Sequence, residues 1–435
     1  MPAVTRGAQT RIALGALAAL ALLASCGERR GALELTVGAE IDALARAPTP
    51  SVLVVERVAQ DRTTAELTRV TLPASELDLG DQNRNEIASI RVTGLDAAGA
   101  RVVWGETLPV QLGALEGTTL PVFVQRVGEL ARLPGALEPI VEAPRVGLVL
   151  GRFVVAASGA STALYDLLAL AQRTPPALTR PARSLVAIQS AVVAIDEAGA
   201  TSYDLSTGAT ADIPAPTGGT WADVAGGTTV LARDGTQLVV GATRASGGPT
   251  AKVLRVDAQG ITTFVSLAAA REGACAAWLD GRGLVVVGGS PTAAGVEVLA
   301  PDAPVGAPLA FAPDPTRGCA AAPVGASEVL VVGGAPGSPA APPRAVDIAC
   351  ATGCAPSPWP GVLEAADASA VVLGDGSVLV AGDASDGTRV FRVARGAEPV
   401  AIPVRAARRG ARVTALPSGA ALLVGGAREL EQFAP

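Results

Sequence analysis

A segment that recurs along the C-terminal two thirds of the chain constrains the fold more than any other feature. Each copy has a turn, a run of aliphatic residues and, in the clearest copies, a pair of glycines that ends the run. The residues that follow the runs, at positions 156, 194, 241, 288, 333, 381 and 425, are 38, 47, 47, 45, 48 and 44 residues apart. This period is typical of β-propellers, in which a four-stranded sheet cannot bury its faces alone and stacks against copies of itself.

Each copy divides into four short strands, as residues 273–311 illustrate. The first strand leads into the Asp280-Gly281 turn, where glycine supplies the positive φ of a tight hairpin. The aliphatic run at 284–287 is too continuous for a half-exposed strand, so we expect neighbouring copies to cover both of its faces. The glycines that end the run predict a place where other backbone passes too close for a side chain.

This pattern resembles kelch repeats and galactose-oxidase-like propellers, with an arginine before the first strand at Arg271, Arg317 and Arg408. The resemblance implies an all-β fold whose main part is a kelch-like β-propeller, and the seven markers indicate seven blades. Six or eight blades are the alternatives, because the first two copies of the repeat are degraded. The chain lacks the histidine that often follows the family's arginine, and most of the family's aromatic residues. The copper sites of the family need tyrosine and histidine ligands, whereas this chain has only Tyr165, Tyr203 and no histidine.

The segment before the repeats alternates like strands but lacks the glycine pairs, which predicts a small antiparallel sandwich of immunoglobulin or fibronectin type. The chain stops after the third strand of the last blade, so closing the ring requires a fourth strand from 122–127 or 129–133. The expected organisation is a signal peptide at 1–25, a lipidated linker at 26–31, the sandwich at 32–120 and the propeller at 121–435, with its closing strand from about 121–135.

The N-terminus has the features of an export signal. Two arginines and no acidic residue precede an apolar run at 12–22, which is shorter than the roughly 20 residues of a membrane span. The run ends in Leu-Ala-Ser-Cys at 23–26, which resembles the lipobox of bacterial lipoproteins and implies a lipidated Cys26. An ordinary signal peptide that ends in Ser-Cys is the alternative. Gly27 in place of aspartate favours, by the same resemblance, the outer over the inner membrane.

Composition narrows the range of functions. The 34 basic and 40 acidic residues are scattered, so no nucleic-acid partner is expected. The absence of histidine excludes Ser-His-Asp and Cys-His catalysis and histidine-based metal sites. The single lysine, Lys252, lies in a strand-like segment where a solvent-facing side chain is expected rather than a covalent catalyst. We therefore predict no catalytic residue, no cofactor and no metal.

Four cysteines remain if Cys26 is lipidated, an even number in an oxidising compartment. Cys350 and Cys354 are predicted to form a disulfide, because Gly353 permits the turn that brings them together. Cys275 and Cys319 occupy matching places on the first strands of successive repeats. They are expected to face each other near the axis, either bridged or as two buried thiols.

Two other candidate sites are weaker. Residues 81–86 alternate oxygen ligands like the start of a calcium loop, but Glu86 replaces its glycine, so a plain polar turn is preferred. Paired carboxylates of a glycosidase are conceivable near the starts of first strands, although rim charges there are more often solvated. The carboxylates concerned are Glu272, Asp314, Glu364 and Asp367.

These observations predict a non-catalytic, lipid-anchored envelope protein whose propeller is a protein-protein interaction or ligand-binding scaffold, a monomer that binds another envelope or extracellular protein. Variable loops at 242–248 and 335–339 are expected to provide binding specificity. The alternatives are an extracellular glycan-binding protein and a carboxylate-based, glycosidase-like enzyme. Aromatic platforms for a sugar are scarce, since Trp221, Trp278 and Trp359 do not recur at one position of the repeat.

Overall fold

The structure is a computed structural model, and it describes residues 32–73, 79, 83, 85–115, 118–243, 247–335, 342–361 and 363–435. The expected signal peptide and Cys26 lie outside these residues, as do parts of the 81–86 turn and of the loops at 242–248 and 335–339. The regular secondary structure of the described chain is almost entirely β-strand, with two 3-10 turns, η1 (Leu112–Leu115) and η2 (Trp221–Asp223). It contains no helix long and apolar enough to cross a bilayer.

Seven four-stranded sheets are present in the described residues, and we number them as blades 1 to 7. Blade 1 is β10 (Arg145–Val149), β11 (Phe153–Ser158), β12 (Ser161–Asp166) and β13 (Ala171–Arg173). Blade 2 is β14 (Ser184–Ile188), β15 (Ala191–Ile195), β16 (Ala200–Asp204) and β17 (Thr210–Ile213). Blade 3 is β18 (Thr228–Leu231), β19 (Gln237–Val240), β20 (Thr250–Val256) and β21 (Thr262–Arg271).

The remaining blades follow the same order. Blade 4 is β22 (Cys275–Leu279), β23 (Gly283–Val287), β25 (Val296–Leu299) and β26 (Ala307–Pro308). Blade 5 is β28 (Cys319–Pro323), β29 (Glu328–Gly333), β30 (Arg344–Asp347) and β31 (Ser357–Pro358). Blade 6 is β32 (Ala366–Val372), β33 (Val378–Ala384), β34 (Gly387–Val393) and β35 (Val400–Ile402). Blade 7 is β36 (Arg412–Ala415), β37 (Ala421–Val424), β38 (Glu431–Phe433) and β9 (Leu130–Arg132).

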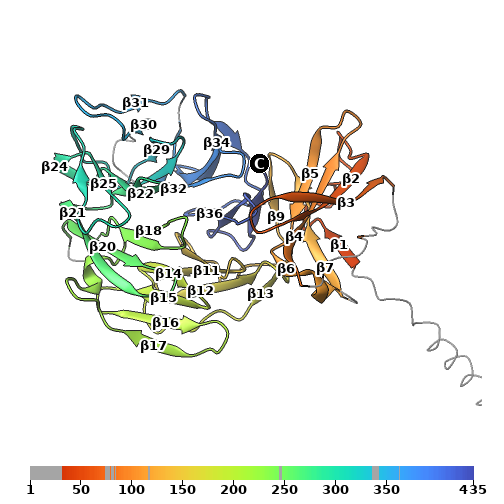
Figure 1. Cartoon of the computed structure of the whole chain (residues 1–435), viewed down its shortest axis with the longest axis horizontal. Helices are drawn as coiled ribbons and strands as arrows, with labels where there is room; N and C mark the ends of the chain where they lie inside the picture. The colour runs from red at the N-terminus through yellow and green to blue at the C-terminus, as the bar shows by residue number, and fades with distance from the viewer. Residues whose placement is uncertain are drawn as a thin grey trace, which may run out of the picture.

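The first strands of the blades form a closed circle. Each contacts the first strand of the next blade, from β10 through β14, β18, β22, β28 and β32 to β36, which contacts β10 again. Figure 1 shows the blades arranged in this order around a ring, from yellow-green to blue. The fold is therefore an all-β propeller, as the sequence predicted.

Blade 7 closes the ring with a strand from the other end of the propeller sequence. Phe433 of β38 pairs with Leu130 of β9, and Glu431 pairs with Arg132. Of the two segments considered from the sequence, 129–133 supplies the strand. The other segment contains β8 (Gln125–Arg126), which pairs with a strand of the sandwich instead.

Each aliphatic run is buried between two neighbouring blades, and alternate residues belong to different interfaces. In β23, Leu284 and Val286 pack in a cluster with blade 3, whereas Val285 and Val287 pack in a cluster with blade 5. All four side chains are almost completely buried. This arrangement explains why the run lacks the polar alternation of a half-exposed strand.

The glycine after the run lies against the next blade. Gly288 has a φ of +78°, and a Cβ there would lie 2.5 Å from the carbonyl oxygen of Thr316, just before blade 5. Likewise, a Cβ at Gly241 would lie 2.4 Å from Ala274 O, and a Cβ at Gly333 would lie 2.5 Å from Ala365 O. Both the backbone conformation and the lack of space therefore require glycine at these positions.

A small sandwich precedes the propeller. One sheet has the order β3 (Thr64–Thr71), β2 (Val52–Val58), β4 (Ile87–Leu95), β5 (Arg101–Glu106) and β8, and β6 (Val110–Gln111) pairs with β4. The other sheet joins β1 (Ala32–Thr36) and β7 (Thr119–Phe123) in parallel, whereas an antiparallel arrangement was expected. Since β7 and β8 pair with strands of this unit, its sheets continue past residue 120 to Arg126.

The sandwich packs directly on blade 7. Trp104 and Phe123 belong to the same buried cluster as residues of blades 1 and 7. The Gln125 amide donates to Gln432 O at 3.0 Å, and Gly128 N donates to Ala434 O at 2.8 Å. Figure 1 shows the sandwich, in red and orange, beside this end of the ring.

The role of the glycines can be tested with a matched pair of variants. Gly281 also has a positive φ, +73°, but nothing lies within 4 Å of its Cβ position. We expect Gly281→Ala to cost about 1 kcal/mol from backbone strain alone. Gly288→Ala should cost about 1–3 kcal/mol more, because its methyl group meets Thr316 O. Calorimetric melting of both variants measures the difference, and equal melting temperatures would contradict the crowding argument.

Candidate binding site on the propeller axis

The arginines of the repeat pattern are internal cross-links in two blades. Arg271 is fully buried and donates to Gly288 O and Ala294 O, both at 2.7 Å, and pairs with Glu297 at 3.3 Å. Arg408 repeats this arrangement in blade 7, where it donates to Gly425 O at 3.3 Å and pairs with the buried Glu431. These arginines hold the second and third strands of a blade to the segment before its first strand, so they are structural.

Arg317 does not repeat this arrangement. Arg317 lies 16 residues before the glycine that ends the aliphatic run of its blade, Gly333. Arg271 and Arg408 lie 17 residues before the corresponding glycines, Gly288 and Gly425. A shift of one residue turns a side chain to the opposite face of a strand. Half of the Arg317 side chain is exposed, and it pairs with Glu272 at 2.9 Å.

Each of the four carboxylates considered for a glycosidase has its own arginine partner. Glu272 pairs with Arg317, Asp314 with Arg344 at 2.6 Å, Glu364 with Arg389 at 3.0 Å, and Asp367 with Arg412. Two-thirds of the Glu364 side chain is exposed. The structure thus shows ion pairs rather than an acid and a base that face one substrate.

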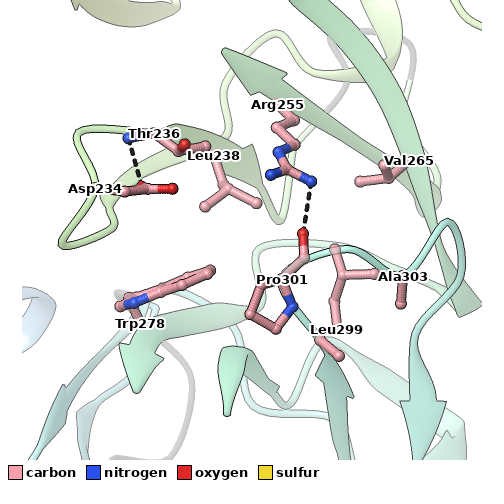
Figure 2. Close-up of a pocket in the computed structure, with 10 residues that line it drawn as sticks. Asp234, Thr236, Leu238, Arg255, Val265, Trp278, Leu299, Pro301 and Ala303 are labelled. Atoms are coloured by element: carbon pink, nitrogen blue, oxygen red, sulfur yellow. Dashed lines mark hydrogen bonds between the residues drawn. The ribbon is translucent and has the colours of Figure 1, made fainter. Parts of the chain in front are cut away.

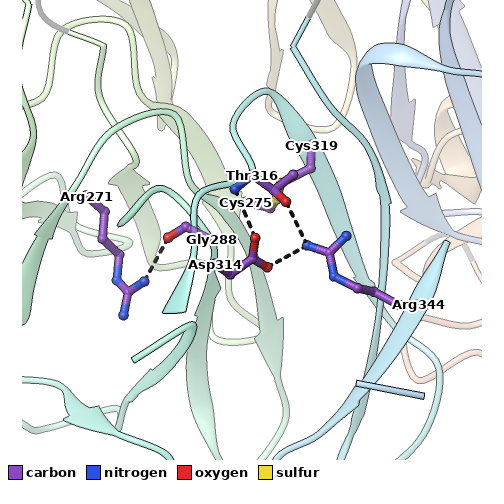
Figure 3. The surroundings of a disulfide bond; sticks show 7 residues. All are labelled: Arg271, Cys275, Gly288, Asp314, Thr316, Cys319 and Arg344. Atoms are coloured by element: carbon purple, nitrogen blue, oxygen red, sulfur yellow. Dashed lines mark hydrogen bonds and ion pairs between the residues drawn. A yellow bond between two sulfur atoms is a disulfide. The ribbon is translucent and has the colours of Figure 1, made fainter. Parts of the chain in front are cut away.

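Both candidate disulfides are present. Cys275 and Cys319 join blades 4 and 5, with their Cα atoms 5.3 Å apart (Figure 3). Their positions do not match, because Cys275 pairs with Val287 before the glycine of its blade and Cys319 pairs with the glycine itself, Gly333. The Cys275–Cys319 disulfide closes a separation of 44 residues and stabilises the folded chain by about 4 kcal/mol, because it reduces the entropy of the unfolded chain. The Cys350–Cys354 disulfide closes only 4 residues and contributes about 2 kcal/mol.

The aromatic side chains form no exposed platform in the described structure. Trp221 and Trp359 are buried and donate to Ile213 O at 3.1 Å and Ala397 O at 3.2 Å. Trp278 lines a cavity of about 10 Å³ with Asp234 and Arg255 (Figure 2). A cavity of this size holds at most one water molecule, so it is not a sugar site.

The two tyrosines and the lysine also have structural surroundings. Tyr165 is fully buried and donates to Pro134 O at 2.7 Å, and its burial raises the pKa of the phenol. Lys252 reaches Ser266 Oγ at 3.4 Å within blade 3. In the described part of the chain, no three histidine, cysteine, aspartate or glutamate side chains are grouped as a metal ion would require.

Three arginines that the sequence analysis did not single out gather where neighbouring first strands begin. Arg412 and Arg145 are the first residues of β36 and β10, and Arg183 directly precedes β14. These strands are neighbours in the ring. We call Arg145, Arg183 and Arg412 the axial arginines. The signal that could have revealed them is an arginine at the start of the first strand in three copies of the repeat.

Arg145 reaches past blade 2 to blade 3. Its Nη2 donates to Gly226 O, just before the first strand of blade 3, at 3.0 Å, and Arg183 Nη2 donates to Thr243 O, after the second strand of blade 3, at 2.8 Å. Burial lowers the pKa of the Arg145 guanidinium, and the charges of Arg412 and Arg183 lower it further, while Asp367 raises it. These contacts place the axial arginines together over one end of the ring.

The axial arginines differ in how their charges are balanced. Arg183 pairs with Glu197 at 3.4 Å, and Arg412 pairs with Asp367. Arg145 has no ion pair with a carboxylate of the described residues, and its hydrogen bond there is to a backbone carbonyl. An arginine enclosed by protein without a carboxylate is a favourable place for an external anion.

A recess in the surface lies between the sandwich and blade 7. It has a volume of about 630 Å³, within the usual range of ligand sites, and residues 34–39, 132–135 and 428–429 line it. Its arginines are paired elsewhere, Arg132 with Glu40 at 2.8 Å and Arg428 with Glu138 at 3.3 Å. No aromatic residue lines it. The axial arginines are therefore the better candidate for a binding site.

Fold and site together define a β-propeller protein with an N-terminal β-sandwich. No protein-family model matches the chain, and no curated protein is similar to it in sequence. Among solved structures it is similar to a copper-bound fungal alcohol oxidase of the AA5 family, with 14% identity over 69% of this chain and 76% of the oxidase and a TM-score of 0.37. It is also similar to YCF48 bound to a D1 peptide (10% identity, 71% and 95% covered, TM-score 0.44). A third is the N-terminal domain of Nup159 (12% identity, 68% and 89% covered, TM-score 0.41).

The oxidase corrects one expectation. The fold was one ground for the prediction that the chain is not an enzyme. On that ground the prediction is wrong, because the alcohol oxidase, a protein of similar fold, is an enzyme. The copper site itself does not fit this chain, because the chain has no histidine and Tyr165 is buried against Pro134 O.

The Asp314–Arg344 pair gives a test of the charges at the junction of blades 4 and 5 (Figure 3). Burial alone would raise the pKa of Asp314, but hydrogen bonds from Thr316 and Arg344 outweigh it and lower the pKa. The stabilisation is therefore present above the ordinary pKa of aspartate, about 4, and is lost as the pH falls through the lower, folded-state pKa.

We expect Asp314→Asn to lower the stability by about 1.5–3 kcal/mol at pH 7, because two hydrogen bonds to a charged group are weakened. The difference from wild type should shrink below about pH 4. Asp302→Asn is the control, because that side chain is 98% exposed and should have little effect. Melting curves between pH 2 and 8 measure both, and a difference that stays constant with pH would contradict the assignment.

Proposed function

We propose that this protein is an exported lipoprotein of a bacterial cell envelope, acylated on Cys26, and that its propeller is a scaffold that binds another envelope or extracellular protein. The observation that carries the binding role is Arg145, an enclosed guanidinium without a carboxylate partner among the described residues. An external acidic group would complete this site, and the loops around it would add contacts. The resemblance of residues 23–26 to a lipobox supports the anchor.

The proposed anchor would hold the sandwich close to the membrane. Cys26 and Ala32, where β1 begins, are six residues apart, a distance of roughly 20 Å at most for an extended chain. We favour the outer membrane, because Gly27 follows the cysteine. The hydrogen bonds between the sandwich and blade 7 support a fixed orientation of the propeller over the bilayer.

We also propose that the protein is a monomer. Pairing of β9 with β38 completes the last blade from the same chain, so ring closure needs no second copy.

Fractionation of cells that express the full chain tests the anchor. Wild type should appear in the membrane fraction with a diacylglyceryl mass on an N-terminal Cys26. Cys26→Ser should lack that mass and leave the membrane after processing, or keep an unprocessed signal peptide. Cys350→Ser is the control, since it removes a cysteine far from the N-terminus and should remain acylated. An unmodified Cys26 in the mature wild-type chain would overturn the anchor.

Crosslinking in intact cells, followed by affinity capture of the lipidated protein, tests the scaffold role. One or a few envelope or extracellular proteins should co-purify with wild type and be absent when an unrelated lipoprotein is captured. If wild type and the unrelated lipoprotein capture the same proteins, the scaffold role is overturned.

A further inference from the structure

The axial arginines are arranged to receive one carboxylate. Arg145 has five N–H donors, and a single hydrogen bond, to Gly226 O, is formed with the described residues. Its neighbours Arg183 and Arg412 contribute two more guanidinium groups, at the starts of the adjacent first strands. A carboxylate can accept two parallel hydrogen bonds from one guanidinium, which makes Arg145 suited to its recognition.

The net charge of the axial arginines and their carboxylate partners favours a singly charged anion. Three guanidinium groups face the carboxylates of Glu197 and Asp367, which leaves one net positive charge. A single carboxylate neutralises this charge, whereas a phosphate, with about two negative charges at neutral pH, would leave an excess. The balance therefore favours an aspartate or glutamate side chain over a phosphate group.

The site is also accessible enough for a side chain from outside. Arg145 is partly exposed although protein encloses it, and 38% of the Arg183 side chain is exposed. The whole chain carries a net charge of -6, so its overall field does not attract acidic molecules. Recognition must therefore come from the local contacts of the axial arginines.

We propose that the axial arginines bind an acidic segment of the partner protein, with one aspartate or glutamate carboxylate on the Arg145 guanidinium. This proposal rests on the proposed scaffold function and specifies the chemistry of its partner. Arg183 and Arg412 position the carboxylate from the two sides, while Glu197 and Asp367 keep the site from accepting a second negative charge.

A labelled hexaglutamate peptide is the probe, with hexaglutamine as its uncharged counterpart, and fluorescence anisotropy measures binding to the full mature chain at low salt. Hexaglutamate should bind wild type at least tenfold more tightly than hexaglutamine. Arg145→Gln should weaken hexaglutamate binding at least tenfold, because the glutamine amide is polar but carries no charge.

Arg282→Gln is the matched control. Arg282 is exposed in the turn between β22 and β23, at the opposite end of a first strand, and its variant should bind hexaglutamate like wild type. Melting curves establish that both variants are folded. If Arg145→Gln unfolds, Arg183→Gln, which changes a more exposed side chain, replaces it with the same expected loss.

Three results would overturn the proposal. The first is equal binding of hexaglutamate by wild type and a folded Arg145→Gln variant, and the second is equal binding of hexaglutamate and hexaglutamine by wild type. The third is displacement of hexaglutamate by inorganic phosphate at similar concentrations, which would identify a site for free anions.

Capture from crosslinked cells separates this proposal from the scaffold function. A partner that co-purifies equally with wild type and Arg145→Gln would overturn the acidic-segment proposal alone. A wild-type chain that binds hexaglutamate but captures no specific partner would support the site and overturn the scaffold function.

Discussion

The burial of each second strand between two neighbouring blades is the interaction on which the rest of the structure depends. Val285 and Val287 in one interface and Leu284 and Val286 in the other lose almost all contact with water. Each such side chain contributes roughly 1.5–3 kcal/mol when buried. A blade at an open end would lose one of these interfaces, so the ring must close. The pairing of β9 with β38 provides this closure.

The propeller fold could be predicted from the period of the sequence, because stacking imposes the same requirements on every blade. Aliphatic runs without polar alternation and glycines at 241, 288 and 333 follow directly from burial on both faces and from contact with the next blade. The parallel pairing of β1 with β7 left no such signal, since parallel and antiparallel edge strands share the same alternation. The mismatch between Cys275 and Cys319 was missed for a related reason, because a repeat alignment does not fix register to one residue.

The axial arginines could not be assembled from the sequence, because ring closure brings them together. Arg412 lies 267 residues from Arg145, and only the contact between β36 and β10 makes them neighbours. The carboxylate candidates failed for another reason. They were chosen by their position near first strands, but each of them has an arginine partner in the folded chain.

Arg271, Arg408, Arg344 and Arg145 differ in the source of their counter-charge. Arg271 and Arg408 are neutralised by Glu297 and Glu431, which lie at the same register of the third strand in their own blades. In blade 5 that register holds Arg344, which opposes Val331 as Glu297 opposes Val286, so the polarity is reversed and Asp314 provides the negative charge. Arg145 has no such carboxylate in the described structure. The buried Arg126 also lacks a carboxylate among the described residues and donates to Arg46 O and Pro48 O. Arg145 differs from Arg126 because it is partly exposed, so its counter-charge can arrive with a ligand.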